Sequence, residues 1–254
     1  MGLIIGAIPT YLFMRQRERA ALEKTYAETR KINAEERQIL AALEKAAAAP
    51  ARKVKLLFIA SNPMDRPELR LAEEIRGIAQ AVRSSRFRES FELQQLWGVH
   101  WTDLRTHLLH DCPDILHFSG HGENEKGLVF EDDQGNAEVI SPEQITALVS
   151  HFSSSVRLVV INTQLPEKLA ADLAKAVDHV VGASVPLADA VAIRFSGLFY
   201  EALANGNSTR NAFDFAAANL DSVDGSKPYR IFVEKDAPEP HLLPQPAREL
   251  PSRL

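Results

Sequence analysis

One histidine of this sequence lies between two glycines at the end of an apolar run. The stretch at residues 115–123 reads ILHFSGHGE, and its second histidine is His121. An imidazole titrates near neutral pH, and flanking glycines allow the backbone to turn sharply. This combination fits a general base beside a backbone that stabilises an oxyanion. A histidine in a strand-to-loop turn is also a common polar residue, so the motif alone does not establish catalysis.

Three polar residues follow a second apolar run. Residues 156–163 read VRLVVINT, so that Asn162, Thr163 and Gln164 lie at the end of an expected buried strand. In open sheets of parallel strands, ligands bind at the carboxyl ends of the strands. The sequence therefore predicts that these residues and His121 face each other across one crevice.

Strand-like and helix-like segments alternate from Lys53 onward. Strands are expected at residues 53–61, 91–97, 115–120, 156–163, 179–183 and 229–233, and a hairpin at 128–131 and 137–140. Helices are expected at residues 67–83, 102–110, 188–204 and 208–220, and another begins at the capping sequence SPEQ, residues 141–144. Strands that are apolar on both faces indicate a mainly parallel sheet with helices on both faces. We therefore expect an α/β fold, preceded by a long N-terminal helix.

Six stretches occur in an order and at a spacing that resemble a known family. They are LLFIASNP, LRLAEEIRGI, PDILHFSGHG, GLVFED, VVINTQ and VVGASVPLADAVAIRFSGLFYEALANG. Together they resemble the CHAT family of caspase-like cysteine peptidases, from about Lys53 to Leu220. The most specific part is HFSGHG followed by the strand that ends in Asn162. The resemblance implies a caspase-hemoglobinase fold for this part of the chain.

The same resemblance implies a role for each residue of the candidate site. His121 matches the base histidine, and the backbone at Gly122 matches the oxyanion donor. In the family, the strand that carries Asn162 usually continues as Asn-Ala-Cys, with the cysteine as nucleophile. This sequence has Gln164 at that position. A carboxamide nitrogen has no reactive lone pair, so Gln164 cannot replace a thiolate, although it could hydrogen-bond to the imidazole.

Three other residues are candidates to replace the missing nucleophile. Cys112 lies nine positions before His121, which places it near the opposite end of an extended strand. Thr163 adjoins the expected position, but the alternation of side chains along a strand directs it to the other face. Ser119 shares a face with His121 but has no evident second activating group. We therefore expect no intact nucleophile.

Two further polar residues have a structural and a functional interpretation. Asp189 opens an expected helix, where it either lines a pocket for a basic group or is a first-turn acid stabilised by the helix dipole. His117 lies within an expected strand and is interpreted as a hydrogen-bonded core residue. The sequence contains no cluster of metal ligands and no phosphate-binding glycine loop after the first strand, so neither a metal nor a cofactor is expected.

Charge and cysteine content restrict the classes of partner. The 254 residues carry a formal net charge of −5, and no local basic patch is recognisable, so we expect no nucleic-acid partner. The single cysteine, Cys112, excludes an internal disulfide, a thiolate zinc site and a CxxC redox pair. This cysteine usage is compatible with a reducing cytosol.

The sequence predicts four regions along the chain. Residues 1–14 form an apolar run followed by arginines at positions 15, 17 and 19, which is typical of a membrane anchor that leaves the following chain in the cytoplasm. The run is short for a complete crossing, so a segment buried against a partner is the alternative. Residues 15–50 read as a helical stalk, either a coiled coil that forms a homo-oligomer or a solvated helix. Residues 51–236 form the CHAT-like domain, and residues 237–254 a proline-rich tail that is expected to be disordered.

These features predict a membrane-associated protein whose folded domain lies in the cytoplasm. We expect it to act as a pseudo-peptidase that binds a peptide or a partner protein through His121, Asn162, Gln164 and Asp189. The resemblance to CHAT proteins suggests a regulatory role in bacterial signalling or defence. The alternatives are an active peptidase with a non-cysteine nucleophile, and a structural role in which the stalk self-associates.

Overall fold

The computed structural model describes residues 24, 28, 30–32, 34–39, 52–220, 227–233 and 242. The chain divides into two compact units, Met1–Arg52 and Lys53–Leu254. In the first unit, the described residues between positions 24 and 39 are helical and exposed, as expected for the predicted N-terminal helix. The predicted anchor at residues 1–14 lies outside the described residues, as does all of the predicted tail except Leu242. None of the helices among the described residues combines the length and apolar character needed to cross a membrane.

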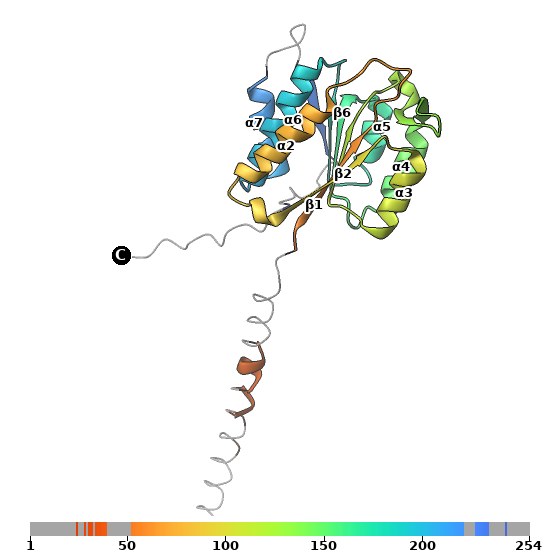
Figure 1. Cartoon of the computed structure of the whole chain (residues 1–254). Coiled ribbons are helices and arrows are strands. Elements are labelled where there is room, and N and C mark those ends of the chain that lie inside the picture. Colours follow the sequence, from red (N-terminus) through yellow and green to blue (C-terminus); the bar gives the residue numbers. More distant parts are fainter. Residues whose placement is uncertain are drawn as a thin grey trace, which may run out of the picture. The chain divides into compact units, whose positions relative to one another are not determined.

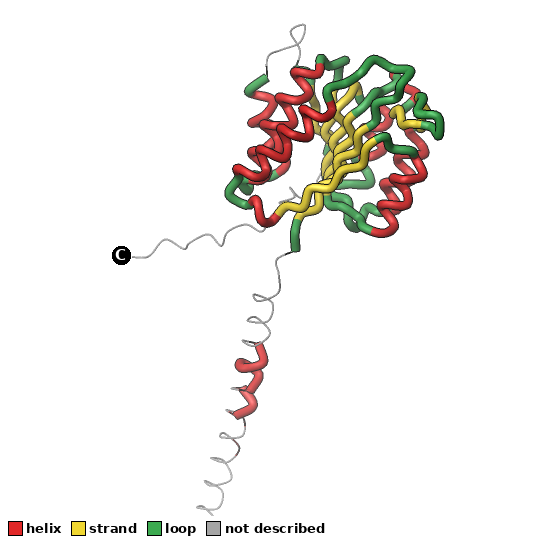
Figure 2. The backbone as a smooth tube through the Cα atoms, in the orientation of Figure 1, coloured by secondary structure: helices red, strands yellow, loops and turns green. Residues whose placement is uncertain are grey.

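The second unit is built around a six-stranded sheet. Its strand order is β2-β1-β3-β6-β7-β8, and only the pair β7 and β8 is antiparallel. The strands are β1 (Val54–Ala60), β2 (Phe91–Trp97), β3 (Ile115–Ser119), β6 (Leu158–Gln164), β7 (His179–Ala183) and β8 (Tyr229–Phe232). A separate antiparallel hairpin consists of β4 (Leu128–Glu131) and β5 (Ala137–Ile140). Figure 2 shows the twisted sheet (yellow) between two layers of helices (red).

Helices cover both faces of the sheet (Figure 1). One face carries α2 (Leu71–Ser84), α6 (Asp189–Ala204) and α7 (Thr209–Ala218), and the other carries α3 (Trp101–His110), α4 (Pro142–His151) and α5 (Glu167–Leu173). Two short 3-10 helices, η1 (Arg88–Ser90) and η2 (Asn124–Lys126), complete the described elements. The expected α/β fold with a mainly parallel sheet is therefore confirmed.

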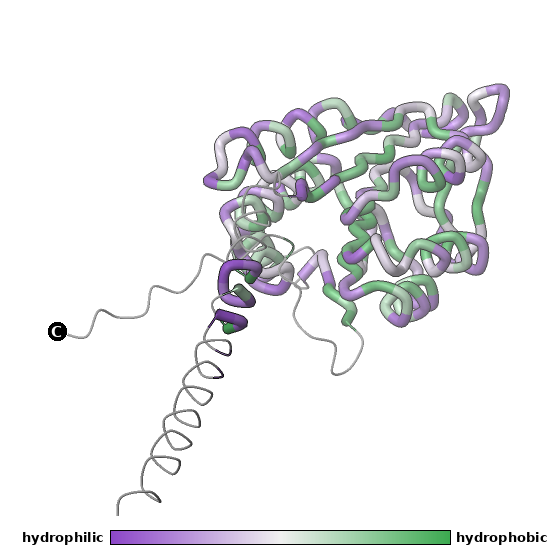
Figure 3. The backbone as a smooth tube through the Cα atoms, turned by 90° about the horizontal axis from the view of Figure 1, so that it is seen from below, coloured by the Kyte–Doolittle hydropathy of each residue, from purple (hydrophilic) through white to green (hydrophobic). Residues whose placement is uncertain are grey.

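The sequence of β1 explains why both faces are covered. Leu56, Phe58 and Ala60 belong to the core cluster on the α2 face, whereas Leu57 and Ile59 belong to the cluster on the α3 face. Successive side chains of a strand point to opposite faces, so a continuous apolar run needs a helical layer on each side. Figure 3 shows hydrophilic residues (purple) gathered in the outer loops and turns of this unit.

Several element boundaries differ from those predicted. The helix expected from residue 67 begins at Leu71, because residues 67–70 are held as a loop. Asn62 Oδ1 accepts a hydrogen bond from the Leu69 backbone N at 3.2 Å, and Asp189 Oδ2 accepts one from the Arg70 backbone N at 3.0 Å. The helix start at Ser141 is confirmed as a capping box with Gln144.

Candidate functional site

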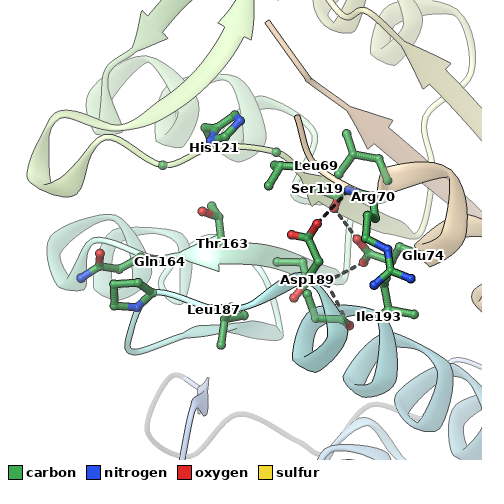
Figure 4. A pocket seen from close by; sticks show the side chains of 16 residues that line it. Leu69, Arg70, Glu74, Ser119, His121, Thr163, Gln164, Leu187, Asp189 and Ile193 are labelled. Carbon is green, nitrogen blue, oxygen red and sulfur yellow. Dashed lines mark hydrogen bonds between the residues drawn. The ribbon is translucent and has the colours of Figure 1, made fainter. Parts of the chain in front are cut away.

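A crevice lies at the carboxyl ends of β3 and β6, where the sequence predicted a site (Figure 4). Its volume is about 180 Å³, and its walls come from the loop before α2, the loop after β3, the end of β6 and the start of α6. All five residues that were predicted to form the site line this crevice: His121, Gly122, Asn162, Gln164 and Asp189. The fold thus brings together residues that are far apart in the sequence.

The imidazole of His121 is oriented by the loop that precedes α2. Its Nε2 lies 3.0 Å from the carbonyl oxygen of Pro67. A carbonyl only accepts hydrogen bonds, so Nε2 carries the proton and Nδ1 carries the lone pair in the neutral ring. Burial lowers the pKa of His121 below its ordinary value of 6.5, and the charge of Arg66 acts in the same direction. The ring is therefore neutral at pH 7 and holds a nitrogen that can accept a proton.

The lowered pKa of His121 can be measured by its NMR titration. The ring resonances are expected to titrate with a midpoint below 6.5, and Arg66→Gln is expected to raise that midpoint by removing a nearby positive charge. Because the folded-state pKa lies below the unfolded-state value, the unfolded chain binds the proton more readily. The contribution of His121 to stability is therefore lost as the pH falls below about 6.5. A midpoint at or above 6.5 would contradict this environment.

Gly122 lies against the end of β6. A Cβ atom at this position would lie 2.8 Å from the carbonyl oxygen of Gln164 and 3.3 Å from Thr163 Oγ1. The first distance is shorter than a van der Waals contact, so a larger residue would force the histidine loop away from β6. The glycine therefore allows the close approach that holds the two walls of the crevice together.

A β-bulge near the end of β6 corrects the prediction for Thr163. Ile161 pairs with Gly182 and Gln164 pairs with Ala183, which directly follows Gly182. Asn162 and Thr163 of β6 therefore have no pairing partner in β7. A bulge interrupts the alternation of side chains. Thr163 therefore lines the crevice together with Asn162 and Gln164 instead of pointing to the other face. Figure 4 shows the Thr163 side chain directed toward the side that carries His121.

The other expectations for the catalytic positions have different outcomes. No hydrogen bond joins Gln164 to His121 in the described part of the chain, because His121 Nε2 is directed at Pro67 and the Gln164 amide points away (Figure 4). Ser119 lines the crevice, but it is buried and its hydroxyl donates to the carboxylate of Glu74. Cys112 is not among the lining residues, and burial raises the pKa of its thiol.

A buried carboxylate beneath the crevice was missed by the sequence analysis. Glu74 is 2% exposed, and its Oε1 accepts hydrogen bonds from His117 Nε2 at 2.9 Å, Asn162 Nδ2 at 2.5 Å and Ser196 Oγ at 2.7 Å. Its other oxygen accepts a hydrogen bond from Ser119. Burial alone would raise the pKa of Glu74, but the hydrogen bonds of His117, Ser119 and Ser196 hold it below its ordinary value. Glu74 is therefore an ionised group at the floor of the crevice.

This network extends to two buried tyrosines. The Tyr200 hydroxyl lies 3.0 Å from His117 Nδ1, and the Tyr229 hydroxyl donates to Asn162 Oδ1. Burial and the charge of Glu74 raise the pKa of both tyrosines well above 10, so both keep their protons. His117 is fully buried and bonded through both nitrogens, which confirms its interpretation as a core residue. The network ties together α2, β3, β6, α6 and β8, and so fixes the orientation of Asn162.

One sequence signal could have revealed Glu74. The buried face of α2 carries Leu71, Ile75, Ile78 and Val82 at helical spacing, and Glu74 falls on this same face. A carboxylate among apolar positions of an amphipathic helix must be paired when it is buried. Its partners come from three other elements, β3, β6 and α6, so the sequence alone does not name them.

Asp189 is the first residue of α6 and is half-buried at the rim of the crevice. Its Oδ2 accepts the hydrogen bond from the Arg70 backbone, whereas the Arg70 guanidinium binds Glu73 instead. Asp189 forms no salt bridge among the described residues, although the charge of Arg70, which also lines the crevice, lies near enough to interact with it. In the same described regions, no group of three or more acidic, histidine or cysteine residues is arranged to hold a metal ion.

Sequence comparison relates this chain to one curated protein. The protein is a "Roc-COR-CHAT protease" from an unknown prokaryotic organism, which is 28% identical over 158 residues. The chain is thus related to a CHAT protease. The match covers 59% of this chain and 15% of the relative, so the chain spans only a small part of that protein's length. No family model matches the chain. The relationship supports the resemblance seen in the motifs.

Two solved structures are also similar to this chain. One is a secreted C11 cysteine protease from Bacteroides thetaiotaomicron in complex with an irreversible peptide inhibitor, with a TM-score of 0.48 and 10% identity over 65% of this chain and 58% of that chain. The other is caspase-1 from Spodoptera frugiperda, with a TM-score of 0.46 and 10% identity over 72% of this chain and 86% of that chain.

Proposed function

We propose that the crevice binds a peptide or a segment of a partner protein without cleaving it. One observation carries this proposal: the crevice is assembled around an oriented, neutral His121 and the close approach of Gly122, yet it ends in the amide of Gln164. An amide provides hydrogen bonds but no nucleophile. The domain is then a pseudo-peptidase that serves as a binding or regulatory module.

The negative charges of the crevice favour a peptide that carries a basic side chain. Asp189 contributes a carboxylate at the rim that forms no salt bridge among the described residues, and the ionised Glu74 lies at the floor. A lysine or arginine side chain of the bound segment would place its charge beside Asp189. A carboxylate and a guanidinium form charge-assisted hydrogen bonds that are stronger than neutral ones.

A binding experiment with matched peptides tests this function. A fluorescein-labelled peptide with a central arginine is expected to bind the full chain at least about tenfold more tightly than the same peptide with norleucine, as one desolvated ion pair permits. Asp189→Asn preserves the acceptor for the Arg70 backbone and is expected to abolish this preference. Asp214→Asn makes the same charge change on the exposed surface of α7 and should leave it unchanged. Equal binding of both peptides to the natural chain, measured by fluorescence anisotropy, would exclude this recognition.

The remaining parts of the proposal rest on the sequence. The apolar run at residues 1–14 and the arginines that follow it support a membrane anchor, with the folded domain on the cytoplasmic side. The helical residues between positions 24 and 39 support a stalk between the anchor and the domain. In this arrangement the anchor holds the domain at a membrane, where the crevice binds its peptide or partner protein as part of a bacterial signalling or defence process.

One observation favours the alternative of an active peptidase. The bulge of β6 brings the hydroxyl of Thr163 into the crevice, next to Gly122 and on the side of His121. A hydroxyl becomes a nucleophile only when an adjacent base accepts its proton. No hydrogen bond joins Thr163 to His121 in the described structure, so the binding function is the better supported of the two.

A further inference from the structure

The strand β2 forms one edge of the sheet, away from the crevice. All seven of its residues pair with β1 in an unbroken parallel register, from Phe91 opposite Val54 to Trp97 opposite Ala60. On its outer side, β2 has no strand partner among the described residues (Figure 1). An edge strand directs part of its backbone N–H and C=O groups outward, where another extended segment can pair with them.

This edge lacks the features that usually prevent strand addition. The sequence of β2 is FELQQLW, which contains one charged residue, Glu92, and no proline. Its register with β1 shows no bulge. Natural proteins commonly protect exposed edges with lysines, prolines or bulges. The absence of these features from β2 leaves an edge of seven residues without a bulge.

A groove of about 390 Å³ runs beside this edge, between β2 and α2. Phe91, Leu93 and Gln95, which alternate along β2, face the groove, and Ala79 and Val82 of α2 form its opposite wall. In a strand added to β2, every second side chain would face this groove. The groove shares no residue with the crevice, so the two surfaces are separate.

The charges of the groove indicate which segment would fit. Arg83 is exposed and has no partner among the described residues, and Arg88 is exposed beside Glu89, with an Nε to Oε1 distance of 3.5 Å. Two cations against one anion favour an acidic segment. Pairing of β2 with a second copy about a two-fold axis would place the same arginines on both sides of the junction, which is unfavourable.

We infer that β2 and this groove bind an extended acidic segment of another protein by strand addition. The backbone of the segment pairs with the outer edge of β2. Of the side chains that face α2, apolar ones lie against Val82 and Leu93, and acidic ones lie beside Arg83 and Arg88. Backbone pairing provides affinity, and the groove provides specificity, as in other cases of strand addition.

A pair of peptides tests this inference on the full chain. The probe is fluorescein-labelled Glu-Thr-Val-Thr-Val-Thr-Glu, and its counterpart carries glutamine in place of each glutamate, so that neither peptide offers a cation to Asp189 in the crevice. The acidic peptide is expected to bind at least about tenfold more tightly, and the double variant Arg83→Glu with Arg88→Glu is expected to reverse this order. Arg76→Glu makes a charge reversal on α2 outside the groove and should leave the order unchanged.

Hydrogen–deuterium exchange locates the bound peptide. The acidic peptide is expected to slow exchange in the segment Phe91–Trp97, because its backbone occupies the outward groups of β2. Equal binding of the two peptides to the natural chain would overturn the inference. So would an equal loss of affinity for the acidic peptide in the Arg83/Arg88 variant and the Arg76 variant, or an unchanged rate of exchange in β2. A dimer that protects β2 without peptide would also overturn it and would identify a second copy as the occupant. The Arg83/Arg88 variant should keep its preference for the arginine peptide at the crevice, which separates this inference from the proposed function.

Discussion

Glu74→Ala is expected to lower the free energy of unfolding by about 3–5 kcal/mol, because several buried donors lose their shared acceptor at a cost of about 1–3 kcal/mol each. The substitution leaves donors on His117, Asn162, Ser119 and Ser196 without their shared acceptor in a region that excludes water. Each buried donor without an acceptor carries a desolvation cost. Urea denaturation of the variant and the natural chain measures the difference.

Two controls separate this effect from a general loss of charge. Glu73→Ala removes the neighbouring glutamate, whose partner Arg70 is exposed, and should lower the free energy of unfolding far less than Glu74→Ala does. Acid titration of stability is the second control. Because the pKa of Glu74 is held below its ordinary 4.5, its contribution is present above about pH 4.5 and is lost as the pH falls through the lowered pKa. A loss in Glu74→Ala no larger than that in Glu73→Ala would refute the role of the network.

Gln164→Cys is expected to introduce a reactive thiol into the crevice. The new side chain would replace the amide that ends β6, in a wall that Gly122 holds close to the His121 loop. A thiol that can pass its proton to the neutral imidazole of His121 ionises more readily, because the imidazolium formed by this transfer stabilises the thiolate. We expect it to react with iodoacetamide at pH 7 at least about tenfold faster than an unperturbed thiol.

The natural cysteine serves as an internal reference for this reaction. Burial raises the pKa of Cys112, which is half-buried, so it should react slowly in the same sample. Mass spectrometry of the digested protein gives both rates at once. The double variant Gln164→Cys with His121→Ala should lose the fast reaction and retain the slow one. An introduced thiol that reacts no faster than Cys112 would mean that His121 does not reach this position.

The fold could be predicted because its signals are local. The run Leu56–Ala60 is apolar at every position, which requires helices on both faces of the sheet. The gathering of His121 and Gln164 in one crevice also followed from the sequence, because both residues lie just beyond or at the ends of expected parallel strands. The carboxyl ends of such strands meet at one edge whatever the intervening sequence.

Two features of the site could not be predicted because they depend on contacts between distant segments. The bulge that brings Thr163 into the crevice arises from the pairing of β6 with β7, and the sequence VVINTQ reads as an ordinary strand. The start of α2 depends on Asp189, which binds the backbone of Arg70 across 119 positions of the chain. Similarly, the donors that keep Glu74 ionised come from β3, β6 and α6.

The central claim is that the natural crevice binds a peptide and leaves it intact. The most direct measurement incubates the full natural chain with the arginine peptide, records binding by fluorescence anisotropy and then determines the mass of the recovered peptide. We expect saturable binding that is weakened at least about tenfold in Asp189→Asn, and recovery of the peptide at its original mass. Cleavage by the natural chain that is abolished in His121→Ala and in Thr163→Val would contradict the claim, and would identify an active peptidase with a hydroxyl nucleophile.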